Sequence, residues 1–475
     1  MTTTLFYILL YIVGLICVLP LSRKIPLWIL ASTGFLWGKL IWIFCSAITL
    51  FLGMTFNITN MLILLAIVVI GAVWLNISYK TWKLTPTQYL SIILGVGAFT
   101  ISSYLLTKQY YLYATSDSFS IILMSQILSE SGLQLWTLNQ FTEWGLIAPV
   151  FQMASSLLGE GYISGYQTLL AGSLLIVFSI SIYQAFSRHF KPSLSYLFTG
   201  LSVLIITTII FVEHAVYIHT NLTAAVYLYV ALFAYWNFLQ DDKPEWIILG
   251  TAAMIGVGFS RIEGPLYVIL FLALAITSKQ LKYKHALWIV LPYTILSIIW
   301  NTYLLFSVDQ TGLLSQTNII IIILSLLGLA AFGILSKWLP KITSFQFLIL
   351  GLLTVGTVAA FLLKPDHMSL SLINVIQNLV SRNAWGFTWF LILLLLPLTL
   401  DFNKDSPENR FLIFSITCYL ILVVLFAFPR EPYRLGKTDS ANRMLLQIQP
   451  IIFLYISINS YKIKKWLLPF TEAEK

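Results

Sequence analysis

The sequence predicts an all-α protein, a polytopic helical bundle that crosses a membrane about 15 times. Two observations carry this prediction. Hydrophobic residues make up 59% of the 475 residues and charged residues only 9%, whereas soluble domains carry about 25% charged residues. Apolar runs of about 20 residues also recur along the chain, and a backbone in lipid pairs all its polar groups over such a length only as a helix.

Each predicted span is an apolar run bounded by polar residues or by Gly and Pro. The first run lacks a basic start and a small-residue cleavage site, so we interpret it as a retained span and not as a signal peptide. The predicted spans are 5–21, 27–52, 58–77, 86–106, 164–186, 194–212, 220–239, 246–260, 264–278, 285–306, 319–336, 344–362, 385–400, 411–428 and 446–460.

The charges of the loops predict the orientation. An odd number of spans places the two termini on opposite sides of the membrane. Eighteen of the 27 lysines and arginines then fall on one side and eight on the other, while Lys39 lies inside the second span. The positive-inside rule makes the richer side cytoplasmic, so we expect the N-terminus outside and the C-terminus in the cytoplasm, in a cytoplasmic (inner or plasma) membrane. Because the basic residues are scattered singly, no nucleic-acid partner is expected.

The longest interruption of the apolar pattern defines the predicted organisation. An N-terminal four-span segment, 1–106, precedes an exterior loop, 107–163, and the remaining bundle, 164–475, and together they form a single membrane domain. Within the loop, 115–130 and 144–159 have helical apolar spacing but are too short to cross a bilayer. We expect both to lie at the membrane surface.

Two carboxylates of this loop are candidates for chemistry. Asp117 stands between two serines at the start of the first short helix. There it either caps the helix or, outside the hydrocarbon and partly desolvated, takes a proton from an acceptor hydroxyl as a general base. Glu143 is either a solvated loop charge or a residue that orients substrate.

The motif GFSRIEGPLYV, 258–268, joins two apolar runs of only about 15 residues. Its turn is therefore expected to dip towards the membrane, where a charge is costly unless it is paired or used. Arg261 and Glu263 either form an internal salt bridge, or Arg261 binds a lipid-linked phosphate while Glu263 orients it.

Two further exterior clusters carry candidates. Glu213, His214 and His219 do not have the spacing of a zinc protease motif, so no metal site is expected and the cluster serves substrate contacts or structural hydrogen bonds. Before the last span, Arg443 is the best second phosphate ligand. Behind it in the same loop are two further basic residues and two polar candidates, which are Arg434, Lys437, Asp439 and Asn442.

These features resemble the GT-C superfamily of membrane glycosyltransferases, which take sugar from a polyprenyl-phosphate donor. The resemblance covers roughly 105–280 and the last loop. It consists of an acidic exterior loop with two interfacial helices, starting at Asp117; a Pro–apolar–Leu-Gly helix, Pro149 to Gly159; an Arg-x-Glu-Gly turn, Arg261 to Gly264; and Arg443 before the last span.

The resemblance implies a function and roles for these residues. Asp117 would be the catalytic base, and Arg261 and Arg443 would bind the donor phosphate. The reaction would transfer a hexosyl or pentosyl unit with inversion to a hydroxyl of a glycan, lipid or protein on the exterior face. The protein would also contact membrane lipid. No cofactor is expected, because a lone carboxylate such as Asp117 is a poor divalent-cation site.

Two other classes of protein share some of these features. A transporter or flippase of a lipid-linked saccharide would also need intramembrane cations, and Lys39 suits it. However, no inverted duplication is visible, and the charges concentrate on one face. An oligosaccharide polymerase or ligase would share the long exterior loops.

Overall fold

The computed structural model describes residues 2–81, 83–108, 115–278, 281–307, 316–335, 344–400, 406–437 and 439–463. All regular elements within these ranges are helices. Eleven of them are long and apolar enough to cross a membrane, or twelve if α11 and α12, which are bent by 68° at a short break, form one span. The chain is therefore a multi-pass membrane protein with an all-α fold.

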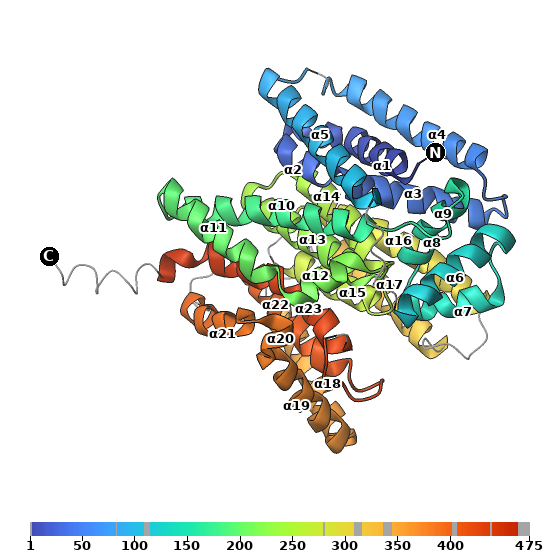
Figure 1. Ribbon diagram of the computed structural model, residues 1–475. Helices are drawn as coiled ribbons and strands as arrows, with labels where there is room; N and C mark the ends of the chain where they lie inside the picture. Colours follow the sequence, from blue (N-terminus) through green and yellow to red (C-terminus); the bar gives the residue numbers. More distant parts are fainter. Residues whose placement is uncertain are drawn as a thin grey trace.

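The N-terminal helices form the upper layer of Figure 1. The predicted span 27–52 is divided at Thr33, where the backbone leaves helical geometry. Most of the α4 and α5 surface is exposed and apolar, as expected for helices that face lipid. The elements are α1 (Thr3–Val18), η1 (Leu19–Arg23), α2 (Leu27–Ser32), α3 (Gly34–Phe51), α4 (Ile58–Ser78) and α5 (Pro86–Lys108).

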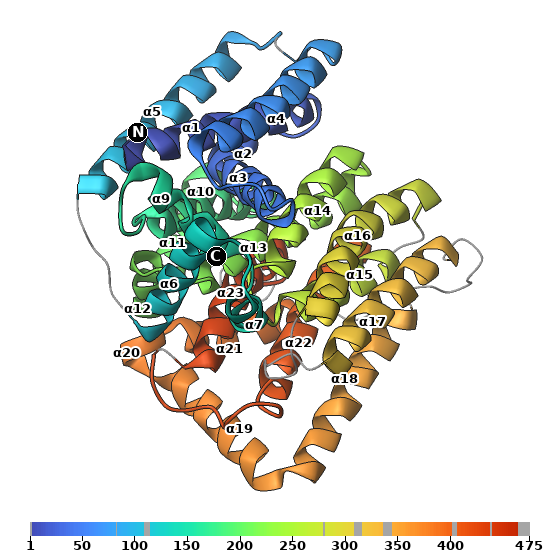
Figure 2. The ribbon, with the colours of Figure 1, turned by 90° about the vertical axis from the view of Figure 1, so that its right-hand side faces the viewer.

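Four short helices follow and gather on one face of the bundle, which is turned towards the viewer in Figure 2. The predicted helix 115–130 is α6, and the predicted helix 144–159 is divided between α8 and α9. The helix between them, α7, was not predicted. The bounds are α6 (Ser116–Ser131), α7 (Leu135–Trp144), α8 (Ile147–Gln152) and α9 (Ala154–Leu158).

The middle of the bundle is built around α13, whose apolar window is completely buried. Its neighbours α10, α14, α22 and α23 enclose it on several sides (Figure 1). The bounds are α10 (Tyr166–Ser187), α11 (Pro192–Ile206), α12 (Ile209–Val216), α13 (Asn221–Asp241), α14 (Pro244–Gly258), α15 (Gly264–Thr277), α16 (Tyr283–Ser307), α17 (Gln316–Leu335) and α18 (Ser344–Leu363).

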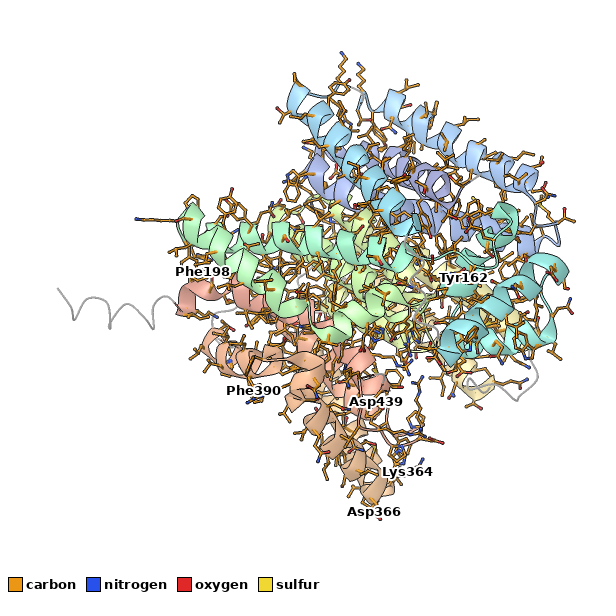
Figure 3. All side chains as sticks on the ribbon, viewed as in Figure 1. Tyr162, Phe198, Lys364, Asp366, Phe390 and Asp439 are labelled. Atoms are coloured by element: carbon orange, nitrogen blue, oxygen red, sulfur yellow. The ribbon has the colours of Figure 1, made fainter. Side chains whose placement is uncertain are left out.

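In the C-terminal part of the chain, a helix is found where the sequence predicted a loop. The predicted spans 344–362 and 385–400 leave 363–384 as a loop between them, but these residues contain the amphipathic helix α19, which meets α18 in a sharp corner (Figure 2). Lys364 and Asp366 lie at this corner, at the bottom of Figure 3. The bounds are α19 (Pro365–Val380), α20 (Arg382–Trp385), α21 (Thr388–Thr399), α22 (Pro407–Leu425) and α23 (Ser440–Ile458).

All 15 predicted spans lie on helices, but 27–52 and 194–212 each fall on two helices, and three other spans fall on single short helices. α14, α15 and α21 have 15, 14 and 12 residues, less than the about 20 that a bilayer needs. The count of 15 spans therefore stays a prediction. The turn between α14 and α15 carries Arg261, as the sequence predicted.

Contacts between loops show that the two ends of the described chain lie at opposite ends of the bundle. Thr3 donates a hydrogen bond to Glu160, next to the short helices α8 and α9. At the other end, His189 lies 3.2 Å from the carbonyl oxygen of Ile458, and the ammonium group of Lys462 donates to the carbonyl of Thr399 at 3.0 Å.

Candidate functional site

A charged cavity of about 730 Å³ opens at the end of the bundle that carries α6 and α7. A larger hollow of about 1170 Å³ lies between α10 and α11, but no charged residue lines it. We therefore place the candidate site in the charged cavity. Its ionisable lining residues are Asp117, Glu143, Arg261, Lys364, His367, Arg430, Glu431 and Arg443.

Asp117 reaches this cavity because another residue caps its helix. The hydroxyl oxygen of Thr115 accepts the backbone N–H of Ser118 at 3.1 Å, so Thr115 is the N-cap of α6 and the carboxylate of Asp117 is left for other partners. The Ser118 hydroxyl donates to the carbonyl of Ile218 at 3.0 Å and attaches the start of α6 to the loop before α13. The sequence left two roles open for Asp117, a helix cap or a general base, and the structure assigns the cap to Thr115.

Asp117 binds two groups through one oxygen. Arg443 donates from Nη1 to Oδ2 at 2.9 Å, and Nε2 of His219 lies 3.0 Å from the same atom. Burial alone would raise the pKa of the carboxyl group, but the hydrogen bond from His219 and the charge of Arg443 outweigh it and hold the pKa well below its usual range. Asp117 is therefore a firmly ionised carboxylate.

His219 is held in one tautomer. The backbone N–H of Thr220 donates to Nδ1 at 2.8 Å, so in the neutral ring the proton is on Nε2 and is donated to Asp117. Burial lowers the pKa of His219 to about 4, helped by the charges of Arg261 and Arg443 and opposed by the hydrogen bond to Asp117. The imidazole is therefore neutral at physiological pH and acts as a fixed hydrogen-bond donor.

A second ion-pair group lies in the turn between α14 and α15. Arg261 donates from Nε to Oε2 of Glu263 at 2.9 Å, and Nη2 of Arg430 lies 3.1 Å from Oε1. Arg261 also hydrogen-bonds the side-chain oxygen of Asn221 at the start of α13. Burial would raise the pKa of Glu263, but the two guanidinium groups lower it to about 2. The predicted salt bridge of Arg261 with Glu263 exists, and Arg261 lines the cavity as well.

Glu143 lies in the last turn of α7, and the residues after it fix its position. The backbone N–H groups of Leu146 and Ile147 donate to the carbonyl oxygen of Phe259 at 2.9 and 3.1 Å. Gly145 has a φ of +72°, and a Cβ at this position would lie 2.6 Å from the carbonyl of Ser260. Only glycine therefore allows α7 to end against the turn that carries Arg261.

Several other residues that the sequence predicted for the site lie outside the charged cavity. Lys437 pairs with Glu213 at 3.3 Å, and the buried His214 lies 3.2 Å from the Tyr217 hydroxyl. Asn442 accepts a hydrogen bond from the indole of Trp385 at 2.8 Å. None of the predicted residues Lys437, Glu213, His214 and Asn442 lines the charged cavity.

Arg434 and Asp439 line a smaller adjoining cavity of about 390 Å³. Asp439 accepts the backbone N–H groups of Ala441 and Arg434, both at 2.9 Å, and caps α23. Arg434 is 77% exposed and pairs with the equally exposed Glu431, and such a surface pair contributes little energy. Both residues lie beside the main cavity and not in it.

Sequence reasoning did not single out Arg430, Lys364, His367 or the role of His219. Arg430 was visible as one of four basic residues of the last exterior loop, but the sequence did not rank it above Arg434 or Lys437. The ammonium group of Lys364 donates to the carbonyl of Phe428 at 3.0 Å, and His367 contacts that of Ala427 at 2.8 Å. These contacts attach the corner of α19 to the loop of Arg430, and no local pattern indicates them.

Among the described residues, no group of three or more His, Cys, Asp or Glu side chains is arranged to hold a metal ion. Comparison with protein-family models, with curated proteins and with solved structures found no match to this chain. The functional conclusion therefore depends on the geometry and charge of the cavity.

Proposed function

We propose that this protein is a membrane glycosyltransferase that moves a sugar from a polyprenyl-phosphate donor to a hydroxyl group of an acceptor. The observation that carries the proposal is the meeting of Asp117, Arg261 and Arg443 at one cavity. They lie far apart in the sequence, and sequence reasoning chose them as one base and two phosphate ligands. The cavity lies at one end of the bundle. A lipid carrier would present its phosphate group at the membrane boundary, which is where this end of the bundle is expected to lie.

The charges of the cavity suit a phosphodiester. Three arginines reach it, and their planar donor groups match phosphate oxygens. In the reaction, an acceptor oxygen forms a bond to the anomeric carbon while the bond from that carbon to the phosphate oxygen breaks. The electron pair leaves with the polyprenyl phosphate, and the hydroxyl proton passes to a carboxylate of the cavity. Cations that are already in place stabilise the developing phosphate charge, and a single displacement inverts the anomeric carbon.

The proposal includes the expected orientation and location. The cavity would face the exterior side of a cytoplasmic membrane, where a lipid-linked sugar meets glycan, lipid or protein acceptors. The alternative of a carrier receives less support. Lys39, the cation that suited it, is completely buried, with Thr223 at 3.1 Å and the rings of Phe151 and Tyr166 above it, and it lines none of the cavities described above.

Purified protein in lipid nanodiscs with a radiolabelled polyprenyl-phosphate sugar tests the function directly. We expect release of polyprenyl phosphate and transfer of the label to an acceptor, or slow transfer to water when no acceptor is present. A protein that binds the donor and moves it across the bilayer with its glycosidic bond intact would be a carrier and not a transferase.

Donor binding tests the roles of the arginines. A charge-assisted hydrogen bond contributes about 1.5–3 kcal/mol, so Arg443→Ala is expected to weaken donor binding by about tenfold or more. Arg261→Lys keeps the positive charge but loses the planar donor group of the guanidinium. It should therefore weaken donor binding less than Arg443→Ala does. Arg188→Ala, at the opposite end of the bundle, is the matched control. Equal donor affinity of Arg443→Ala and wild type would remove Arg443 from the phosphate site.

A further inference from the structure

We propose that Glu143 is the proton acceptor of the transfer reaction, and that Asp117 is a positioning residue that holds Arg443 until the donor phosphate replaces it. This inference rests on the proposed function. It reverses the expectation from sequence, in which Asp117 was the base.

The surroundings of Asp117 make it a weak base. Its Oδ2 atom already receives Arg443 and His219, and its carboxylate lies in the first turn of α6, where the helix dipole favours negative charge. All three effects stabilise the ionised form. A general base works best when its pKa lies near the working pH, and the pKa of Asp117 is held well below that range.

The surroundings of Glu143 raise the pKa of its carboxyl group instead of lowering it. It lies in the last turn of α7, where the helix dipole disfavours a carboxylate. Among the described residues no ion pair or side-chain hydrogen bond engages it, although it lines the same cavity as Arg261 and Arg443. Glu143 is exposed at the cavity, and partial desolvation there together with the nearby charge of Asp117 raises its pKa, against the smaller lowering effects of Arg430 and Arg261. The other ionisable groups facing this cavity are Lys364, His367, Glu431 and Arg443.

The structure also fixes Glu143 relative to the proposed phosphate ligand. Gly145, Leu146 and Ile147 attach the end of α7 to the turn at 259–261. The neighbouring Trp144 lines the cavity and packs edge to face against His219, with ring centroids 6.2 Å apart. A sugar bound against Trp144 would therefore occupy the cavity that Glu143 and the arginines line.

In this proposal, the ion pair of Asp117 with Arg443 opens when the donor phosphate binds and forms again when the phosphate leaves. A donor phosphate competes with Asp117 for the guanidinium group, while the neutral His219 keeps its hydrogen bond to Asp117. When the phosphate leaves as product, Arg443 returns to Asp117. The acceptor hydroxyl gives its proton to an oxygen of Glu143 as its own oxygen bonds to the anomeric carbon, so no other reactant is required.

The test compares two carboxylate-to-amide variants of the full-length protein in nanodiscs with a polyprenyl-phosphate sugar. General-base catalysis contributes about 10²–10⁴-fold, so Glu143→Gln should lose at least a hundredfold in transfer while donor affinity stays within about threefold. The acidic limb of the pH profile of kcat/KM should disappear with it. Asp117→Asn should bind donor at least as tightly as wild type, lose less than about tenfold in transfer and keep the acidic limb.

Glu130→Gln, an exposed residue at the end of α6 outside the cavity, is the matched control and should behave as wild type. The inference is overturned if Asp117→Asn loses the acidic limb, or if Glu143→Gln retains transfer within threefold of wild type. A wild-type protein that binds no polyprenyl-phosphate sugar and transfers none would instead overturn the proposed function, so the two failures are distinguishable.

Discussion

At the scale of single residues, Glu263 organises the positive side of the cavity. Its side chain is 3% exposed and binds Arg261 and Arg430 through different oxygens. Two guanidinium groups that would repel each other are thereby held side by side at the wall of one cavity. Removing the carboxylate would leave two poorly solvated positive charges without a counter-charge, which is far more costly than losing an exposed pair.

We therefore expect Glu263→Gln to lower the free energy of unfolding by about 3 kcal/mol at neutral pH. Because the pKa of Glu263 is about 2 in the folded protein, below the usual value of 4.5, its contribution is present above pH 4.5 and disappears as the pH falls towards 2. Thermal unfolding in detergent should show the difference between wild type and variant shrinking over this window. A difference that stays constant, or grows on acidification, would contradict the assignment.

The sequence singled out residues at places where a charge is expensive in its local context, and Asp117, Arg261 and Arg443 line one cavity, while their roles stay predictions. Arg261 was singled out because it interrupts two short apolar runs, and Asp117 and Arg443 because each stands near the start of a helix in a loop predicted to be exterior. The sequence could not show that His219 donates to Asp117, since the two are 102 residues apart. Nor could it show that Thr115 caps α6, because Thr115 and Asp117 are both acceptable N-cap residues.

At the scale of elements, the end of α7 connects the two halves of the site. Gly145 and Gly132 both have a positive φ, of +72° and +68°, and each directly follows a helix, α7 and α6 respectively. They differ in their surroundings. A Cβ at Gly132 would meet no atom within 4 Å, whereas at Gly145 it would overlap the backbone of Ser260 and Arg261.

This contrast predicts different outcomes for the same substitution. Both Gly132→Ala and Gly145→Ala place a side chain in a region that costs about 1–3 kcal/mol. Gly145→Ala must also push the end of α7 away from the turn of Arg261, at a further cost of about 1–3 kcal/mol. We expect it to lower both the melting temperature and the transfer rate, while Gly132→Ala lowers the melting temperature only. Equal transfer rates of the two variants would show that the packing of α7 on this turn has no part in activity.

The sequence predicted long helices better than short ones. A run of about 20 apolar residues has few alternatives in lipid, so every predicted span lies on helix, although 27–52 and 194–212 are each divided between two helices. The helices α7 and α19 were missed because their polar faces make them look like loops in a hydropathy pattern. The side chains of Asn374 and Asn378 on α19 donate to the carbonyl groups of Tyr433 and Arg434, so this helix supports the loop of Arg430 through contacts that only the fold creates.

At the scale of the whole molecule, loop charges divided the chain into two faces before any contact was known. Four of the predicted exterior loops contribute lining residues to the charged cavity, among them Asp117, Arg261, Lys364 and Arg430, and predicted cytoplasmic loops contact one another at the other end. In the latter group, Lys282 lies 3.7 Å from Asp242. Loop charge predicts the side of a loop well because translocation depends on it directly. It carries no information on which loops touch, and that is set by packing.

The orientation of the two faces can be measured with single cysteines in a background lacking Cys17, Cys45 and Cys418. A membrane-impermeant maleimide should label E130C and D366C in intact cells, because the proposed orientation places the cavity outside. K191C and K282C should react only after permeabilisation. All four positions are exposed at the ends of the bundle. The reverse pattern would turn the cavity towards the cytoplasm and contradict the proposed orientation.

The burial of Lys39 has a consequence for biosynthesis. Its hydroxyl partner, Thr223, lies 184 residues later in the chain, and its aromatic neighbours Phe151 and Tyr166 also follow it. When α3 leaves the translocation machinery, its ammonium group has none of these partners. The first helices therefore cannot complete their packing until α13 has been made, and Lys39 delays final assembly of the N-terminal layer until nearly half of the polypeptide has been synthesised.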